Sequence, residues 1–263
     1  MTLARRLCAV LPCDDKGRPV RRFEKGGLDV DFLEAIAAWL ERDGADEIWL
    51  KRAGPPPIPA QKKHGSKLLF EPLKILEQQV FIPLVAWAPV QSPSDARLLL
   101  GFGADRVVVD ARLGLPDPLA FVARVVDATG PDRVSCAVHF RRVAGDKGVA
   151  FELVDTKGEG TGINALSLID RLPAVGACEI VVVPVLRAPE SERVVHDGEF
   201  IEQASSTLSV PLLSVGDDRE ITDVATPLLM GADGIVTELF AGGKPTVPDA
   251  WRALSEYGLP VRA

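Results

Sequence analysis

Ionisable side chains follow several short apolar runs of the sequence, where they could act on a bound molecule. They are Asp14 and Asp15, Lys51 and Arg52, Asp110 and Arg112, His139 and Arg141, Asp217 and Asp218, and Glu238. His139 is the best candidate for proton transfer because the unperturbed pKa of histidine lies near 6.5. With Asp14 and Asp217 it forms our candidate catalytic set, although simple pairing of His139 with a neighbouring carboxylate is an equally good interpretation. The candidate ligand-binding residues are Arg52, Arg112, Arg141, Arg187 and Glu238.

A metal-dependent alternative uses overlapping residues. Asp14, Asp110, His139, Asp217 and Glu238 would offer a divalent cation oxygen and imidazole ligands. They come from separate segments, so no local ligand spacing tests this alternative, and we assign no metal site. The four cysteines form no CxxC pair, and no nucleotide-binding or zinc-hydrolase motif occurs. We therefore expect no cofactor and no disulfide framework.

The charge balance excludes two classes of partner. The 263 residues include 30 basic and 37 acidic side chains, a net charge of −7, which repels the phosphates of nucleic acids and anionic membranes. No apolar run approaches the roughly 18 residues of a membrane-spanning helix, and no secretory leader is recognisable. We expect a cytoplasmic protein that binds neither nucleic acid nor membranes.

Short apolar runs alternate with helical patterns along the whole chain, which is typical of a parallel sheet built from βα units. The eight predicted strands cover residues 7–11, 48–50, 84–86, 107–109, 134–138, 180–183, 212–215 and 235–237. A helix is predicted over residues 31–42, Asp117 is a predicted N-cap, and Gly44, Gly103, Gly176 and Gly231 are predicted to end helices. Eight such units predict a closed (βα)₈ TIM barrel, with an open doubly wound sheet as the alternative.

An internal repeat supports the barrel. Residues 80–110 align without a gap on residues 208–238, an offset of 128 that is close to half the chain. We therefore expect a single domain over residues 1–263, built from two similar half-barrels of about residues 1–130 and 131–263. Glycines around an alternating stretch in residues 146–162 predict a β-hairpin inserted after strand 5, and residues 54–65 read as a stiff basic connector.

The sequence resembles the cyclase subunit of imidazole glycerol phosphate synthase (HisF) along almost its whole length, and less closely its sister isomerase (HisA). The matching segments are LARRLCAVL, DDKGRPV, GADEIWL, GADRVVV, KGEGTGI, GACEIVV, VPLLSVG and MGADGIV. They fall mainly on scaffold positions. The resemblance implies a (βα)₈ barrel whose mouth, at the carboxyl ends of the strands, holds the active site.

The catalytic positions of that family are not matched here. The resemblance implies opposed aspartates at the ends of strands 1 and 5, where this sequence has Pro12 and His139. Relatives hold two substrate phosphates on glycine-rich turns, but Trp87 and Pro89 occupy one turn. Three carboxylates, Asp217, Asp218 and Glu238, stand at the other end and would repel a phosphate dianion.

The opposite end of the barrel matches better. The resemblance implies a glutaminase docked there, beside a gate of four charged residues that correspond to Arg6, Glu47, Arg106 and Glu179. The alternative is a charge-paired plug that serves stability.

Together these observations favour a diverged HisF-like barrel that is not a working cyclase and is retained as a binding or scaffold subunit or for a different reaction. There are two alternatives. One is an active cyclase (a lyase) that makes imidazole glycerol phosphate in histidine biosynthesis, and the other is a divalent-metal enzyme at the barrel mouth.

Overall fold

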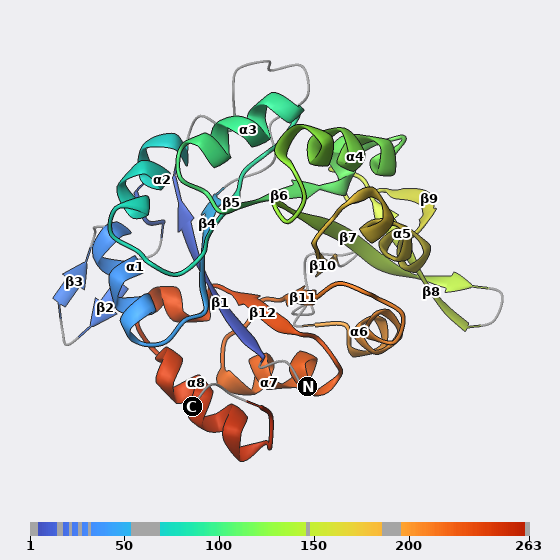
Figure 1. The fold of residues 1–263 in the computed structure, drawn as a ribbon. Coiled ribbons are helices and arrows are strands. Elements are labelled where there is room, and N and C mark those ends of the chain that lie inside the picture. Colours follow the sequence, from blue (N-terminus) through green and yellow to red (C-terminus); the bar gives the residue numbers. More distant parts are fainter. Residues whose placement is uncertain are drawn as a thin grey trace.

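Eight parallel strands close into a barrel surrounded by helices (Figure 1). The computed structural model describes residues 5–14, 18–20, 23–25, 28–30, 33–53, 69–145, 148–185 and 196–260. Pairing of β7 with β10 and of β12 with β1 completes the ring. The predicted closed barrel is therefore confirmed, and the open sheet is wrong.

All eight predicted strands are present. The barrel strands are β1 (Arg6–Cys13), β4 (Glu47–Arg52), β5 (Leu84–Trp87), β6 (Arg106–Asp110), β7 (Val134–Gly145), β10 (Glu179–Pro184), β11 (Leu212–Val215) and β12 (Gly234–Thr237). Their central residues are buried because one face lines the barrel interior and the other packs against the helices.

Helices cover the outside of the barrel. They are α1 (Leu33–Arg42), α2 (Phe70–Glu77), α3 (Pro93–Gly101), α4 (Pro118–Thr129), α5 (Ala165–Arg171), α6 (Gly198–Ser205), α7 (Ile221–Leu229) and α8 (Val247–Glu256). The predicted cap of α4 is confirmed, since the Asp117 side chain accepts a hydrogen bond from the Ala120 amide at 3.0 Å. None of the helices in this described part of the chain is long and apolar enough to span a membrane.

Two antiparallel additions extend the barrel. Strand β7 continues past the barrel and pairs with β8 (Gly148–Val154), which pairs in turn with β9 (Gly160–Asn164). Stacking of Phe140 on Phe200 of α6, with ring centroids 3.8 Å apart, anchors the point where β7 leaves the barrel. A second pair, β2 (Phe23–Lys25) with β3 (Leu28–Val30), follows β1 and was not predicted. The predicted connector at residues 54–65 lies outside the described residues.

A repeated Gly-Ala-Asp turn fixes the starts of the strands. Gly103 and Gly231 both have φ above +100°, a conformation that glycine adopts readily. The aspartate two residues later accepts a hydrogen bond from the first residue of a strand, Leu84 N to Asp105 at 2.8 Å and Leu212 N to Asp233 at 2.9 Å. These contacts recur at the 128-residue offset of the sequence repeat. Superposition of the two halves stays a prediction.

Candidate functional site

Side-chain alternation determines which residues reach the barrel mouth. The interior core is apolar and consists of Cys8, Val10, Trp49, Val85, Val108, Ala137, Val181, Leu213 and Val236. Because every second residue of a strand faces the same side, the residues two positions past this core point into the mouth. Alternation therefore places Lys51, Asp110, His139 and Glu238 there, together with the buried Pro12 of β1.

Two adjoining cavities open at the mouth. One, of about 160 Å³, is bounded by Trp87, Pro89 and Leu113 on its apolar side and by charged residues on the other. The second, of about 310 Å³, is lined by residues that include Asp217 and Glu238. Val183 and Val215 border both cavities, which places the cavities side by side.

A buried acid–base cluster lies in the smaller cavity. Asp110 accepts the guanidinium fork of Arg112, with Nη2 at 2.7 Å and Nε at 3.0 Å. His139 Nδ1 lies 3.6 Å from Asp110 Oδ1, beyond hydrogen-bonding distance but within reach of an ion pair. Burial opposes ionisation of Asp110, but His139 and Arg112 outweigh it and hold the pKa of Asp110 well below its usual value. Asp110 is therefore an anchored carboxylate, and the anticipated pairing of His139 with a neighbouring carboxylate is present.

A second charge pair crosses the mouth. Lys51 Nζ lies 3.1 Å from Glu238 Oε1 and 5.0 Å from the centroid of the Trp87 ring. The Trp87 ring meets Trp49 edge to face at 5.9 Å. The ammonium group is thus held between a carboxylate and an aromatic face.

The remaining predicted site residues lie in different surroundings. Arg52 lines the smaller cavity. Asp14 lies just past β1, where it binds the amide and guanidinium of Arg18 at 2.9 and 2.8 Å, and it lines neither mouth cavity. Arg141 is bound to Glu152 of β8 at 3.0 Å, and half-exposed Asp217 pairs with Arg219 at 3.0 Å. Arg187 lies outside the described residues.

The metal-dependent alternative finds no cluster to support it. Within the described ranges, no group of three or more His, Cys, Asp or Glu side chains could hold a metal ion. All five residues considered for this role are in those ranges, and among them Asp110 and His139 lie 3.6 Å apart.

Sequence reasoning missed a buried network on the outer side of β11. His196 Nδ1 lies 2.7 Å from Ser214 Oγ, and its Nε2 lies 2.8 Å from Asp218 Oδ1. The Asp218 side chain is fully buried against His196, and Asp218 lines the larger mouth cavity together with Asp217 and Glu238. Alternation turns Ser214 toward the helices, between inward-facing Leu213 and Val215. His196 lies 18 and 22 residues before its two partners, and no sequence motif joins them, so the network could not be predicted.

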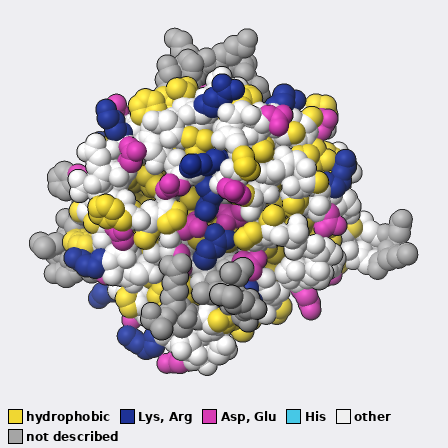
Figure 2. All heavy atoms as spheres, in the orientation of Figure 1, with side chains coloured by type: hydrophobic (Ala, Val, Ile, Leu, Met, Phe, Trp, Pro, Cys, Tyr) yellow, Lys and Arg dark blue, Asp and Glu magenta, His cyan; other side chains and the backbone are white. Residues whose placement is uncertain are grey.

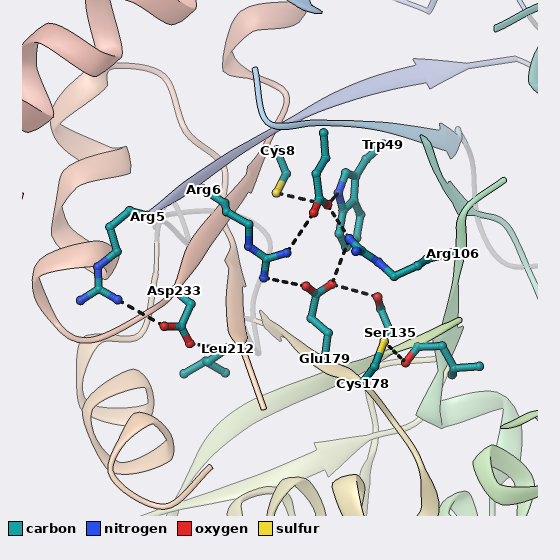
Figure 3. Close-up of polar contacts among 12 residues, drawn as sticks. Arg5, Arg6, Cys8, Trp49, Arg106, Ser135, Cys178, Glu179, Leu212 and Asp233 are labelled. Carbon is teal, nitrogen blue, oxygen red and sulfur yellow. Dashed lines mark hydrogen bonds and ion pairs between the residues drawn. The ribbon is translucent and has the colours of Figure 1, made fainter. Parts of the chain in front are cut away.

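At the opposite end, the four predicted charged residues form one network (Figure 3). Arg6 binds Glu47 at 2.9 Å and Glu179 at 2.7 Å, while Arg106 binds Glu47 at 2.6 Å and lies 3.8 Å from Glu179. Trp49 Nε1 donates to Glu47 at 2.8 Å. We call Arg6, Glu47, Arg106 and Glu179 the charged ring. Figure 2 shows basic and acidic side chains gathered at the centre of the barrel end that faces the viewer.

Three members of the charged ring, Glu47, Arg6 and Arg106, have pKa values shifted toward the ionised form. Burial acts to raise the pKa of Glu47, but Arg106 and Arg6 outweigh it and keep that pKa below its usual value. Burial likewise opposes the charge of Arg6, yet Glu179 and Glu47 raise its pKa. The glutamates are nearly inaccessible, whereas Arg6 and Arg106 retain 22% and 18% side-chain exposure. The ring is thus a closed charge network whose cations reach the surface.

A groove adjoins the charged ring and was also missed. It has a volume of about 690 Å³ and is lined by residues that include Phe81, Pro83, Arg106, Pro131 and Arg133. Phe81, which precedes β5, is 90% exposed. Aromatic side chains are enriched in protein interfaces relative to the rest of the surface. A single phenylalanine between a helix and a strand does not indicate in the sequence that its side chain is exposed.

Comparison with known proteins gives consistent full-length similarity to one kind of protein. The chain is 29% identical over 260 residues to the imidazole glycerol phosphate synthase subunit HisF of Bifidobacterium longum, a match that covers 96% of this chain and 98% of the relative. The subunit of the same name from Bifidobacterium adolescentis is 28% identical with the same coverage. No family model matches the sequence.

Proposed function

We propose that this chain, a HisF-like (βα)₈ barrel, is a binding or scaffold subunit that has retained the partner-docking end of a cyclase barrel without the cyclase reaction. The observation that carries the proposal is the contrast between the two barrel ends. The charged ring is complete at one end, while the two positions that would hold opposed aspartates at the other end are Pro12 and His139.

The mouth supports the loss of the cyclase reaction. Proline has no side-chain proton to exchange, and His139 faces an Asp110 already bound by the Arg112 fork, so these two positions do not supply a pair of opposed carboxylates. Asp217, Asp218 and Glu238 line the larger cavity, two of them paired with Arg219 and Lys51, and we expect this concentration of carboxylates to disfavour a phosphate group there. Two unit charges of like sign about 4 Å apart repel by roughly 4 kcal/mol at an effective dielectric of 20.

The opposite end supports a protein partner of the glutaminase class. Arg106 belongs to both the charged ring and the neighbouring groove, so the two form a continuous surface. Exposed Phe81 supplies an aromatic anchor beside Arg133, and aromatic and arginine side chains dominate the binding energy of most protein interfaces. A charge-paired plug alone would explain the ring but not the exposed phenylalanine.

The test is the association of the purified chain with the glutaminase subunit of an imidazole glycerol phosphate synthase, measured by calorimetry. We expect Phe81→Ser to weaken binding at least tenfold, because a buried aromatic anchor contributes about 2 kcal/mol or more. Ile75→Ser, which changes an exposed apolar residue of α2, is the matched control and should bind as the natural chain does. Absence of association, or equal binding by the two variants, would overturn the docking proposal.

A further inference from the structure

His139 and Asp110 are two titratable groups of the barrel mouth that the docking proposal does not use. His139 lies on β7 and Asp110 ends the neighbouring β6, and both line the smaller cavity. The fork of Arg112 contacts both oxygens of Asp110, at 2.7 Å from Nη2 and 3.0 Å from Nε. A carboxylate held by two parallel donors is fixed in position before any molecule binds. Asp110 is therefore a rigid neighbour of the His139 ring.

The two ring nitrogens of His139 differ in their surroundings. Nδ1 is buried and lies 3.6 Å from Asp110 Oδ1. An ionised carboxylate only accepts protons, so this neighbour favours the neutral ring with its proton on Nδ1 and its lone pair on Nε2. Nε2 makes no hydrogen bond in the described part of the chain and is not closed off as Nδ1 is, so it belongs to the 11% of the side chain that stays exposed.

This arrangement is that of a histidine general base. In such a base one nitrogen is oriented by a carboxylate, and the other presents its lone pair to the reacting molecule. The distance of 3.6 Å exceeds that of a hydrogen bond, but contacts of this kind are commonly long when no substrate is bound and shorten on binding. The pairing of His139 with Asp110 thus serves chemistry as well as charge balance.

The charges that line the smaller cavity are already paired. Lys51 lies 3.1 Å from Glu238, and Arg112 lies 2.7 Å from Asp110. Arg52 has a partner as well. Because an ion would have to compete with these pairs, we expect the cavity to accept an uncharged molecule.

The size and walls of the cavity limit that molecule further. The volume of about 160 Å³ is close to that of an engineered cavity of about 150 Å³ that holds one benzene molecule. Trp87, Pro89 and Leu113 supply an apolar wall. A small body of about one ring therefore fits beside His139.

We propose that His139 is a general base, positioned by Asp110 and Arg112, that hydrolyses small uncharged esters in this cavity. The proposal is independent of the docking proposal, because the mouth and the charged ring lie at opposite ends of the barrel. It is also a different reaction from that of the cyclase, since it uses a histidine in place of two opposed carboxylates.

The proton returns to its donor side by the end of the reaction. Nε2 takes a proton from water while the water oxygen attacks the acyl carbon of the ester. The ring becomes a cation, and the Asp110 carboxylate stabilises it from the Nδ1 side. The bond to the leaving alcohol then breaks, and Nε2 gives its proton to the alcohol oxygen. Ester and water thus give acid and alcohol, and His139 is restored.

The first test is chemical labelling of the natural chain with diethyl pyrocarbonate, followed by peptide mapping. We expect His139 to react at least about tenfold faster than His196, because buried groups react only after local opening. His196 is the matched control within the same chain, since its side chain is 1% exposed and both of its nitrogens have partners at 2.7 and 2.8 Å. A His139 that reacts no faster than His196 would overturn the proposal.

The second test is hydrolysis of para-nitrophenyl acetate, followed by the release of nitrophenolate. We expect saturable hydrolysis that His139→Gln lowers at least about 100-fold in kcat/KM, the lower limit for a general base. Asp110→Asn should lower kcat at least about tenfold with KM nearly unchanged, because Asp110 positions the ring and does not bind the ester. Asp217→Asn, an exposed carboxylate of the larger cavity, is the matched control and should hydrolyse the ester as the natural chain does.

Three results of the second test would each overturn the proposal. They are the absence of saturable hydrolysis, unchanged hydrolysis by His139→Gln, and equal rates for Asp110→Asn and Asp217→Asn. The labelling experiment needs no substitution, so it decides the accessibility of Nε2 even if a variant folds poorly.

Discussion

Replacement of Glu47 by glutamine removes one charge from the charged ring while keeping the shape of the side chain. Glu47 has 4% side-chain exposure and accepts hydrogen bonds from Arg6, Arg106 and Trp49 at 2.9, 2.6 and 2.8 Å. Removing one partner of a buried ion pair costs about 3–5 kcal/mol. Because both arginines keep some contact with water, we expect the lower end, about 3 kcal/mol. For a chain of this size that loss lowers Tm by roughly 6–12 °C.

The assay is urea unfolding together with thermal melting. Glu256→Gln, at the exposed end of α8, is the matched control and should change stability by less than about 0.5 kcal/mol. The pH dependence gives an internal check. The folded-state pKa of Glu47 is below its usual value, so its stabilisation is present above the unfolded-state pKa and is lost as the pH falls through the folded-state value. The stability difference between the natural chain and Glu47→Gln should therefore narrow in acid. A loss below about 1 kcal/mol at neutral pH would refute the reasoning.

Two further matched pairs test other parts of the account by the same unfolding measurement. Gly103→Ala should destabilise the folded protein by about 1–3 kcal/mol, because φ at this position is +105° and a new Cβ would lie 2.7 Å from Glu77 Cβ. The control Gly101→Ala, where a new Cβ would meet open space, should be neutral or stabilising. Equal effects of the two variants would contradict the strain argument. Asp218→Asn should lower the free energy of unfolding by about 1.5–3 kcal/mol, because it weakens the buried contact with His196. The control Asp217→Asn should change the free energy of unfolding by no more than about 0.5 kcal/mol. An Asp218→Asn variant as stable as the natural chain would mean that the network does not stabilise the fold.

Most of the barrel could be predicted because its strands are β-branched runs that are buried on both faces. The boundaries of the strands were harder to predict from the sequence. Strand β7 was predicted to end at residue 138 but continues to Gly145, because beyond Phe140 it leaves the barrel and one of its faces becomes exposed. The short pair of β2 and β3 was missed, since three residues are too few for a periodic pattern.

The two barrel ends differed in how far their contacts could be predicted. The charged ring was predicted from the resemblance, which matches its four members to the gate residues of the cyclase subunit. All four lie at strand starts, where closure of the barrel brings them together. The pairing of Lys51 with Glu238 links residues 187 positions apart, and composition does not indicate it. The His196 network was missed because Ser214 faces the helices rather than the interior. In each missed case the position of the side chain depends on tertiary packing.

The most direct test of the central claim is ammonia-dependent turnover of the cyclase family's ribonucleotide substrate. The purified chain would be assayed beside the HisF subunit of Bifidobacterium longum at saturating ammonium. Each acid–base group contributes about 10²–10⁴-fold to the rate, so with Pro12 and His139 at the two positions we predict turnover at least about 10³-fold below that of the relative. Turnover within tenfold of the relative would contradict the account.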